Sequence, residues 1–216
     1  QFLESKQHPV TAIIGGAKVS SKIPVIKSLL SAVDNLLIGG GMAYTFIKSK
    51  GGHIGESIFE RDMLAVCNEL LKEAADKGVL LLLPEDVIAA ERLDNNAQIK
   101  TLNASNIKNG WMGLDIGEKT QKTFNKIIND SKTILWNGPL GVFEMDSFST
   151  GTKAVADAVV ATTKKGGFSL VGGGDSVAAL KKFNLVDKVS YVSTGGGAML
   201  ERLEGKALPG IVALSK

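Results

Sequence analysis

Leu36-Leu37-Ile38-Gly39-Gly40-Gly41 joins an apolar run to a glycine cluster, and three other stretches of the chain do the same. They are Ile13-Ile14-Gly15-Gly16, Ser169-Leu170-Val171-Gly172-Gly173-Gly174 and Tyr191-Val192-Ser193-Thr194-Gly195-Gly196-Gly197. Each apolar run is typical of a buried strand, and each cluster falls where a strand would turn into a helix. Glycine adopts positive φ and lets a ligand approach the backbone closely. Because helix N-termini favour anions, several such turns on one rim predict a phosphate-binding floor.

Six segments are predicted as strands, and most of them are continuously apolar rather than alternating. They are Val10–Gly15, Asn35–Gly39, Val79–Leu83, Thr133–Asn137, Phe168–Gly172 and Lys188–Ser193. Apolar residues recur at helical spacing between them, within Glu60–Asp76, Glu118–Asn129 and Ser149–Thr163. We therefore expect an α/β fold, a Rossmann-like doubly wound sheet of six mainly parallel strands with helices on both faces. The segment Val87–Asn103 lacks a helical pattern and is expected to add a small extra strand pair.

Composition indicates an ordinary globular protein, since 44% of the 216 residues are hydrophobic and 22% are charged. The net charge of +3 is too small to indicate nucleic acid or an acidic membrane as a partner. The single cysteine, Cys67, excludes an internal disulfide, suits a reducing compartment and most simply belongs to the core. No apolar run approaches the ~20 residues of a membrane span, and the first residues lack a signal-peptide pattern. We expect a soluble, cytoplasmic protein that binds neither nucleic acid nor membrane.

Two familiar phosphate-binding motifs are absent from the sequence. No stretch has the spacing of a Walker A loop, and neither Gly39–Tyr44 nor Gly172–Val177 has the last glycine of the dinucleotide fingerprint. His8, His53 and Cys67 share no metal-ligand spacing, which excludes a metal cluster built from them.

Two lysines follow the first glycine cluster instead. Lys18 and Lys22 fall at or just before a predicted helix start, with Ser20 or Ser21 as the cap and Pro24 in the first turn. Cations there oppose the helix dipole, and an anionic ligand would relieve that conflict. Two solvated lysines explain the same residues equally well.

Asp175 follows another glycine cluster and also begins a predicted helix. Capping preference favours Asp175 as an N-cap, and the alternative is a magnesium ligand beside nucleotide phosphates. Asn137 is most simply a turn residue after a strand, and Glu144 a solvated acid. Three further residues are most simply core or loop hydrophobes: Met112, Leu114 and Val142.

Together these stretches closely resemble the carboxy-terminal domain of the phosphoglycerate kinase family. The resemblance covers nearly the whole chain, in order and with family-like spacing, including the ending Leu203–Gly210. The six motifs that carry it are Gly15–Lys22, Gly39–Phe46, Gly110–Gly117, Trp136–Glu144, Gly172–Ser176 and Ser193–Ala198. Two departures are Ser21, where many members carry Asp, and a looser form of Pro84–Leu93.

The resemblance implies a glycolytic kinase that moves the acyl phosphate of 1,3-bisphosphoglycerate to ADP, giving 3-phosphoglycerate and ATP. Such a transfer needs mostly positioning and charge neutralisation. Lys18 would meet the transferring phosphoryl group, with the catalytic amides of Gly196 and Gly197 beside it. Thr194 and Gly195 would line the same transfer site.

The resemblance also implies the nucleotide and metal contacts. Asp175 would hold the Mg²⁺ cofactor, and Glu144 would hydrogen-bond the ribose hydroxyls. The residues at the nucleotide phosphates would be Lys22, Asn137, Gly173, Gly174 and Ser176. The residues along the adenine slot would be Gly39, Gly40, Met112, Gly113, Leu114 and Val142.

Members of this family also have an amino-terminal domain that binds the phosphoglycerate. We expect residues 1–216 to be a single nucleotide-binding domain that lacks this partner, binds ADP or ATP and turns over negligibly alone. Bisphosphoglycerate or 3-phosphoglycerate would bind only with the missing domain. We expect a monomer with weak self-association through the first residues and Ile211–Lys216. A non-catalytic nucleotide-binding module stays open as the alternative, and a dinucleotide-dependent dehydrogenase suits the fold but not the motifs.

Overall fold

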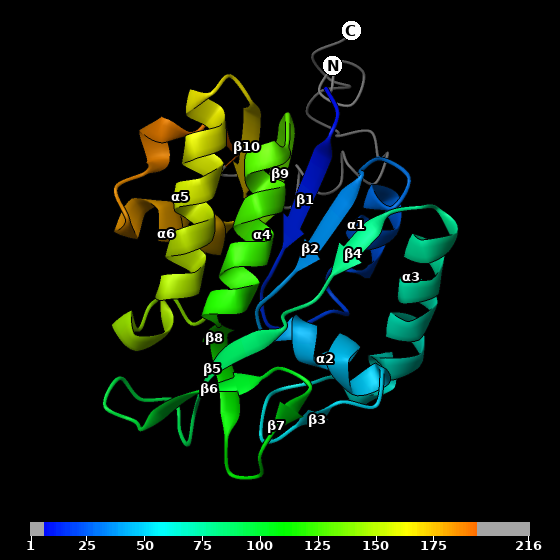
Figure 1. The fold of residues 1–216 in the computed structure, drawn as a ribbon, viewed down its shortest axis with the longest axis vertical. Helices are drawn as coiled ribbons and strands as arrows, with labels where there is room; N and C mark the ends of the chain where they lie inside the picture. The colour runs from blue at the N-terminus through cyan, green and yellow to red at the C-terminus, as the bar shows by residue number, and fades with distance from the viewer. Residues whose placement is uncertain (1–6, 194–216) are drawn as a thin grey trace, which may run out of the picture.

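A six-stranded parallel sheet forms the centre of the molecule in the computed structural model, which describes residues 7–193. The strand order is β11-β10-β9-β1-β2-β4 (Figure 1). The strands are β1 (Val10–Ile14), β2 (Asn35–Ile38), β4 (Leu80–Leu82), β9 (Thr133–Asn137), β10 (Phe168–Gly172) and β11 (Tyr191–Ser193). The parallel pairing and the order confirm the predicted doubly wound fold.

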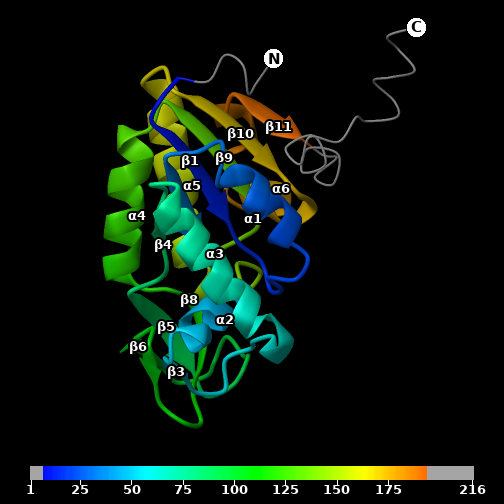
Figure 2. The same ribbon diagram turned by 90° about the vertical axis from the view of Figure 1, so that its right-hand side faces the viewer.

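Helices cover both faces of this sheet (Figure 2). They are α1 (Ile23–Leu29), α2 (Met42–Ser49), α3 (Leu64–Asp76), α4 (Glu118–Asp130), α5 (Thr150–Lys164) and α6 (Gly174–Lys182). Ala12 and Ile14 pack with α1 and α3, including the buried Cys67, whereas Ile13 packs with α4 and α5. Successive strand residues point to opposite faces, so a strand with cores on both faces must be apolar throughout.

A second, smaller sheet lies beyond the carboxyl ends of the large one (Figure 1). It holds three antiparallel strands in the order β6-β5-β8, which are β5 (Asp86–Ala90), β6 (Ile99–Asn103) and β8 (Met112–Ile116). Two short strands pair beside it, β3 (His53–Ile54) and β7 (Asn106–Ile107). The predicted extra pair within Val87–Asn103 is present, but the third strand was missed, because β8 contains Gly113 and Asp115, which are residue types depleted in strands.

The buried carboxylate of Asp86 ties the small sheet to α4. Asp86 accepts hydrogen bonds from the first-turn amides of Lys119 (3.1 Å) and Thr120 (2.8 Å). These amides have no partner within the helix, so Asp86 acts as a cap supplied by another element. This contact positions the small sheet next to the carboxyl ends of the large sheet, where the glycine clusters lie (Figure 1).

Three short helical turns complete the described chain, at Arg61–Met63, Asp146–Phe148 and Val186–Lys188. The last of these corrects the prediction of a strand over Lys188–Ser193, because only Tyr191–Ser193 pairs with β10. Within the described residues, no helix has the length and apolar character needed to cross a membrane. Thr194, Gly195–Gly197 and Ile211–Lys216, to which roles were also assigned, lie outside the described residues.

Three loops meet backbone to backbone where β1, β2 and β9 end. A Cβ added to Gly15 would overlap the carbonyl oxygen of Pro139, and one on Gly40 would lie 2.7 Å from the nitrogen of Gly16. Gly138, at φ +95°, is packed equally tightly against Gly15. Three of the predicted glycine clusters, those after β1, β2 and β10, are confirmed to lie between a strand and a helix. At the first two of them, this junction explains why glycine is needed.

Gly15→Ala should destabilise the fold by about 2 kcal/mol or more, because the new methyl group meets backbone that has no room to move. Urea unfolding followed by circular dichroism would measure the loss. Gly174→Ala is the matched control, since a Cβ there meets nothing within 4 Å and its position is helical. Equal stability of the two variants would contradict the proposed packing constraint.

Candidate functional site

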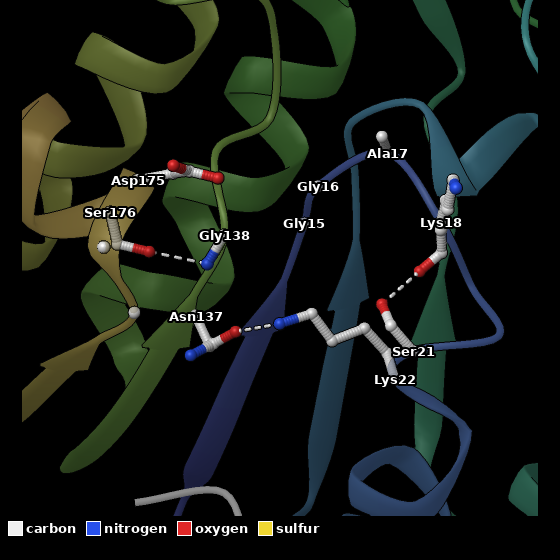
Figure 3. Close-up of a pocket in the computed structure, with 12 residues that line it drawn as sticks. Gly15, Gly16, Ala17, Lys18, Ser21, Lys22, Asn137, Gly138, Asp175 and Ser176 are labelled. Carbon is white, nitrogen blue, oxygen red and sulfur yellow. Dashed lines mark hydrogen bonds between the residues drawn. The ribbon is translucent and has the colours of Figure 1, made fainter. Parts of the chain in front are cut away.

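The carboxyl ends of β1, β9 and β10 surround a polar cavity of about 440 Å³ (Figure 3). Ligands of open α/β sheets bind at this edge. The residues that line it are Gly15, Gly16, Ala17, Lys18, Ser21, Lys22, Asn137, Gly138, Gly173, Gly174, Asp175 and Ser176. Tertiary structure thus brings together residues from three glycine-containing turns that lie far apart in the sequence, from Gly15 to Ser176.

The glycine clusters do not contribute equally to this cavity. The amide of Gly15 donates to the carbonyl of Asn137 (2.9 Å), and the amide of Gly16 to that of Pro139 (3.0 Å). Gly173, at φ +94°, is instead the N-cap of α6, and Gly174 is exposed. Since first-turn amides have no intrahelical partner, the start of α6 is the better anion site of the two.

Lys22 reaches into the cavity from the start of α1, and its ammonium donates to the side-chain oxygen of Asn137 (Figure 3). Asn137 in turn donates to the carbonyl of Gly172 (3.0 Å), which fixes its orientation. Burial lowers the pKa of Lys22, and the nearby carboxylate of Asp175 partly offsets that effect. A half-buried cation of this kind is suited to an anionic ligand.

Lys18 is exposed at the opposite wall, on a loop that Glu60 holds in place. The Glu60 carboxylate accepts from the amide (3.0 Å) and the hydroxyl (2.5 Å) of Ser20. Burial opposes ionisation of Glu60, yet these bonds and nearby Lys18 hold its pKa below the usual value. Glu60 was missed by sequence reasoning, because it lies 40 positions away from the loop that it holds.

The expected caps of α1 and α6 were wrong. Lys22 is the N-cap of α1, because Ser20 is bound to Glu60 and Ser21 donates to the carbonyl of Lys18 (2.9 Å). Asp175 lies inside the first turn of α6, exposed, and makes no capping bond. The Asp175 carboxylate therefore does not serve as the N-cap of α6.

Ser176 supports the turn that follows β9. Its side-chain oxygen accepts a hydrogen bond from the amide of Gly138 (2.6 Å), and the residue is fully buried. The hydroxyl proton of Ser176 is not used by this contact, since the oxygen is the acceptor. Ser176 thus joins the start of α6 to the loop junction.

An apolar slot of about 340 Å³ adjoins the polar cavity, and the two share Gly16, Ala17 and Asp175. Of the residues predicted along this slot, the structure brings together Gly40, Met112, Gly113, Leu114 and Val142, and it adds Glu144, which was predicted at the ribose. Gly39 lines neither cavity, because it lies behind the side chain of Leu140. A long ligand with one polar and one flat apolar end fits such a pair of hollows.

Several residues of the slot were missed by sequence reasoning, among them Tyr44, Ile58 and Leu93. Ile58 and Leu93 are large apolar side chains that are 56% and 53% exposed. The sequence shows that they are apolar, but only the structure shows that they stay uncovered at the edge of a hollow.

Comparison with known proteins identifies the family of this chain. A sequence model described as phosphoglycerate kinase matches residues 1–206. The phosphoglycerate kinase of Porphyromonas gingivalis is 56% identical over 214 residues, which are 99% of this chain and 51% of that protein. This chain belongs to the phosphoglycerate kinase family.

Solved structures of the phosphoglycerate kinase family show the same fold. The enzyme from Coxiella burnetii matches with a TM-score of 0.93 at 47% identity, over 98% of this chain and 54% of that chain. The one from Pyrococcus horikoshii OT3 matches with a TM-score of 0.81 at 28% identity, over 99% and 53%. The chain thus spans about half the length of the phosphoglycerate kinases that it matches, and the predicted family and fold are confirmed.

Asp115 is a buried acid that lies close to the apolar slot. Asp115 is 2% exposed, and it accepts from the amides of Gly151 (2.6 Å) and Ile116 (2.9 Å). Burial raises the pKa of Asp115 to about 7, although the two hydrogen bonds oppose that rise. A Cβ on Gly141, which lines the slot, would overlap its carboxylate.

The raised pKa of Asp115 predicts a pH-dependent stability. The folded chain keeps this proton up to about pH 7, whereas the unfolded chain loses it near pH 4, so unfolding releases a proton between these values. The contribution of Asp115 to the free energy of unfolding should fall with rising pH in this window, by up to about 1.4 kcal/mol per unit.

Urea unfolding of the native chain and of Asp115→Asn at pH 5, 6, 7 and 8 would measure this contribution. The stability difference between the two proteins should change from pH 5 to 7 and stay constant above. Asp157→Asn, at an exposed acid paired with Lys153, is the control and should show no such trend. A difference that is constant across the whole range would contradict the raised pKa.

Proposed function

We propose that this chain is the nucleotide-binding half of a phosphoglycerate kinase, binding Mg-ADP or Mg-ATP for transfer between 1,3-bisphosphoglycerate and ADP in glycolysis. The observation that carries the proposal is the continuity of a cationic, glycine-rich cavity with an apolar slot. A nucleoside diphosphate combines a flat base with a charged tail, and these two hollows match those two parts. Membership in the phosphoglycerate kinase family supports the reaction class.

The phosphate tail would lie at the start of α6. The amides of Gly173, Gly174 and Ser176 would donate to it, and Lys22 beside Asn137 would neutralise its charge. Lys18, at the opposite wall, would meet the transferring phosphoryl group. Thr194, Gly195, Gly196 and Gly197, which lie outside the described residues, would complete the transfer site.

Asp175 would hold the magnesium ion. It is exposed, it borders both hollows, and no three His, Cys, Asp or Glu side chains gather as a metal cluster within residues 7–193. A lone carboxylate fits Mg²⁺, which usually takes one or two protein carboxylates together with phosphate oxygens and water. When bound, the ion would neutralise phosphate charge.

The base and ribose would occupy the slot. Met112, Leu114 and Val142 offer apolar walls, while Gly40 and Gly113 leave room for a flat ring. Glu144 is exposed at the same hollow and would accept hydrogen bonds from the ribose hydroxyls. Gly39 would act only indirectly, by letting Leu140 pack behind the slot.

Residues 1–216 would act as a single domain with negligible turnover alone. Holding two reactants together lowers a reaction barrier by roughly 7–11 kcal/mol. This chain spans about half the length of the relatives that it matches, so it would not hold both reactants by itself. The reduced, buried Cys67 suits a cytoplasmic location, although a relative from Arabidopsis thaliana that is 50% identical is named chloroplastic.

Titration of the chain with ADP, with and without Mg²⁺, tests the nucleotide site. Asp175→Asn should weaken binding at least about tenfold when Mg²⁺ is present, since a metal ligand is lost. Without Mg²⁺ the same variant should bind ADP as well as the native chain or better, because a charge that repels phosphate is gone. Asp187→Asn, at an exposed acid of the turn Val186–Lys188, is the control.

Failure of the native chain to bind ADP would overturn the proposed function. A loss in Asp175→Asn that is independent of Mg²⁺ would contradict the assigned metal role only.

Lys18 separates the kinase from a non-catalytic nucleotide-binding module. In a complete two-domain enzyme carrying this half, Lys18→Ala should lower transfer by about 10²–10³-fold, because charge on the moving phosphoryl group is no longer neutralised. ADP affinity should stay near the native value. Lys27→Ala, an exposed lysine on α1, is the control. Unchanged transfer in a coupled assay would support the non-catalytic module.

A further inference from the structure

Lys182, the last residue of α6, reaches across to the loop that carries Glu144. Its ammonium nitrogen donates to the carbonyl oxygens of Phe143 (3.0 Å) and Glu144 (3.2 Å) and to a carboxylate oxygen of Asp146 (2.6 Å). An ammonium group has three N–H donors, so one short loop uses all of them. The Lys182 side chain is 31% exposed and that of Asp146 is 89% exposed, so water screens the ion pair between them.

The residues on either side of Glu144 are fixed by other contacts. The amide of Val142 donates to the carbonyl of Leu114 (2.9 Å), the amide of Met145 donates to the carbonyl of Val142 (3.0 Å), and Phe143 is buried. Among the described residues, the carbonyls of Phe143 and Glu144 accept hydrogen bonds from Lys182 alone. Lys182 therefore supplements the turn bond between the Met145 amide and the Val142 carbonyl, by holding the carbonyls of Phe143 and Glu144, which lie on either side of the Glu144 Cα.

The two ends of α6 contact the two parts of the site, namely the polar cavity and the loop beside the apolar slot. Its first turn places Asp175 and Ser176 in the polar cavity, and its last turn places Lys182 against the loop at the mouth of the slot. A helix of nine residues is a stiff spacer between them.

We propose that Lys182 is a positioning residue for the nucleotide, which holds the backbone of residues 143–146 so that the Glu144 carboxylate stays at the mouth of the slot. The proposal rests on the proposed function, in which Glu144 binds the ribose hydroxyls. Without Lys182, the base and phosphate contacts remain, but the carboxylate is no longer held in place. The specific consequence is a loss of preference for nucleotides that carry ribose hydroxyls.

Calorimetric titration with ADP and with 2′,3′-dideoxy-ADP tests this inference. The native chain should prefer ADP, and Lys182→Met should lose about tenfold of ADP affinity, the order expected for hydrogen bonds to a charged group. Affinity for the dideoxy nucleotide should stay within about twofold, so the preference largely disappears. Lys182→Arg retains the charge and several donors and should restore most of the preference.

Lys181→Met is the matched control, because it removes the same charge from the same last turn of α6. It should keep the native preference. Thermal unfolding of each variant would confirm that it is folded. Hydrogen exchange without nucleotide gives a second measurement, in which the Met145 amide should exchange faster in Lys182→Met than in Lys181→Met.

The outcomes separate the two proposals. A native chain that binds neither nucleotide overturns the proposed function and this inference with it. A native chain that prefers ADP, with Lys182→Met matching Lys181→Met in preference and in exchange, overturns the inference alone. Equal losses for both nucleotides in Lys182→Met also overturn it, because such a change reflects general damage to the site.

Discussion

The close contact of three loop backbones at the carboxyl edge of the sheet is the constraint on which the site depends. Gly15 packs against Gly138 and Pro139, and Gly40 packs against Gly16 and Pro139, so tightly that no side chain fits at these positions. Trp136, buried in β9, donates its indole N–H to the Gly138 carbonyl (2.8 Å) and so fixes the last of these turns from below. Because these loops pack tightly, they fix the position of the polar cavity relative to the apolar slot.

This arrangement divides the glycines into two physical roles. At the junction, glycine is needed because backbone packs on backbone, and the amides of Gly15 and Gly16 are already bonded. At Gly173 and Gly174, glycine leaves the start of α6 open, where helix amides have no internal partner. Glycine therefore allows close backbone packing at the junction, whereas at the start of α6 it leaves backbone N–H donors open to an anion.

Long-range contacts orient the side chains that would do the chemistry. Glu60 accepts hydrogen bonds from the loop that carries Lys18, and Asn137 accepts one from Lys22. Lys182 donates to the loop that carries Glu144. Each of these contacts joins elements 38 or more positions apart in the chain. The charged groups of the site are thus positioned by tertiary partners rather than by their own segments, as preorganisation of a binding site requires.

The sequence by itself determined the parallel sheet, since apolar runs such as Ile13–Ile14 and Leu36–Ile38 are continuous only when both faces of a strand are covered. It also determined the family, through six motifs, and thereby most residues now found around the two hollows. It did not show the third strand of the small sheet, because β8 contains Gly113 and Asp115, residue types that are depleted in strands.

Only the tertiary structure decided which glycines pack and which face a ligand, because that depends on loops from distant parts of the chain. It also replaced the expected serine caps with Lys22, since Glu60 engages Ser20 from 40 positions away. The physical reason is the same in each case. Local sequence sets the preferences of a segment, whereas the partners of its polar groups and the space around its backbone are set by what folds against it.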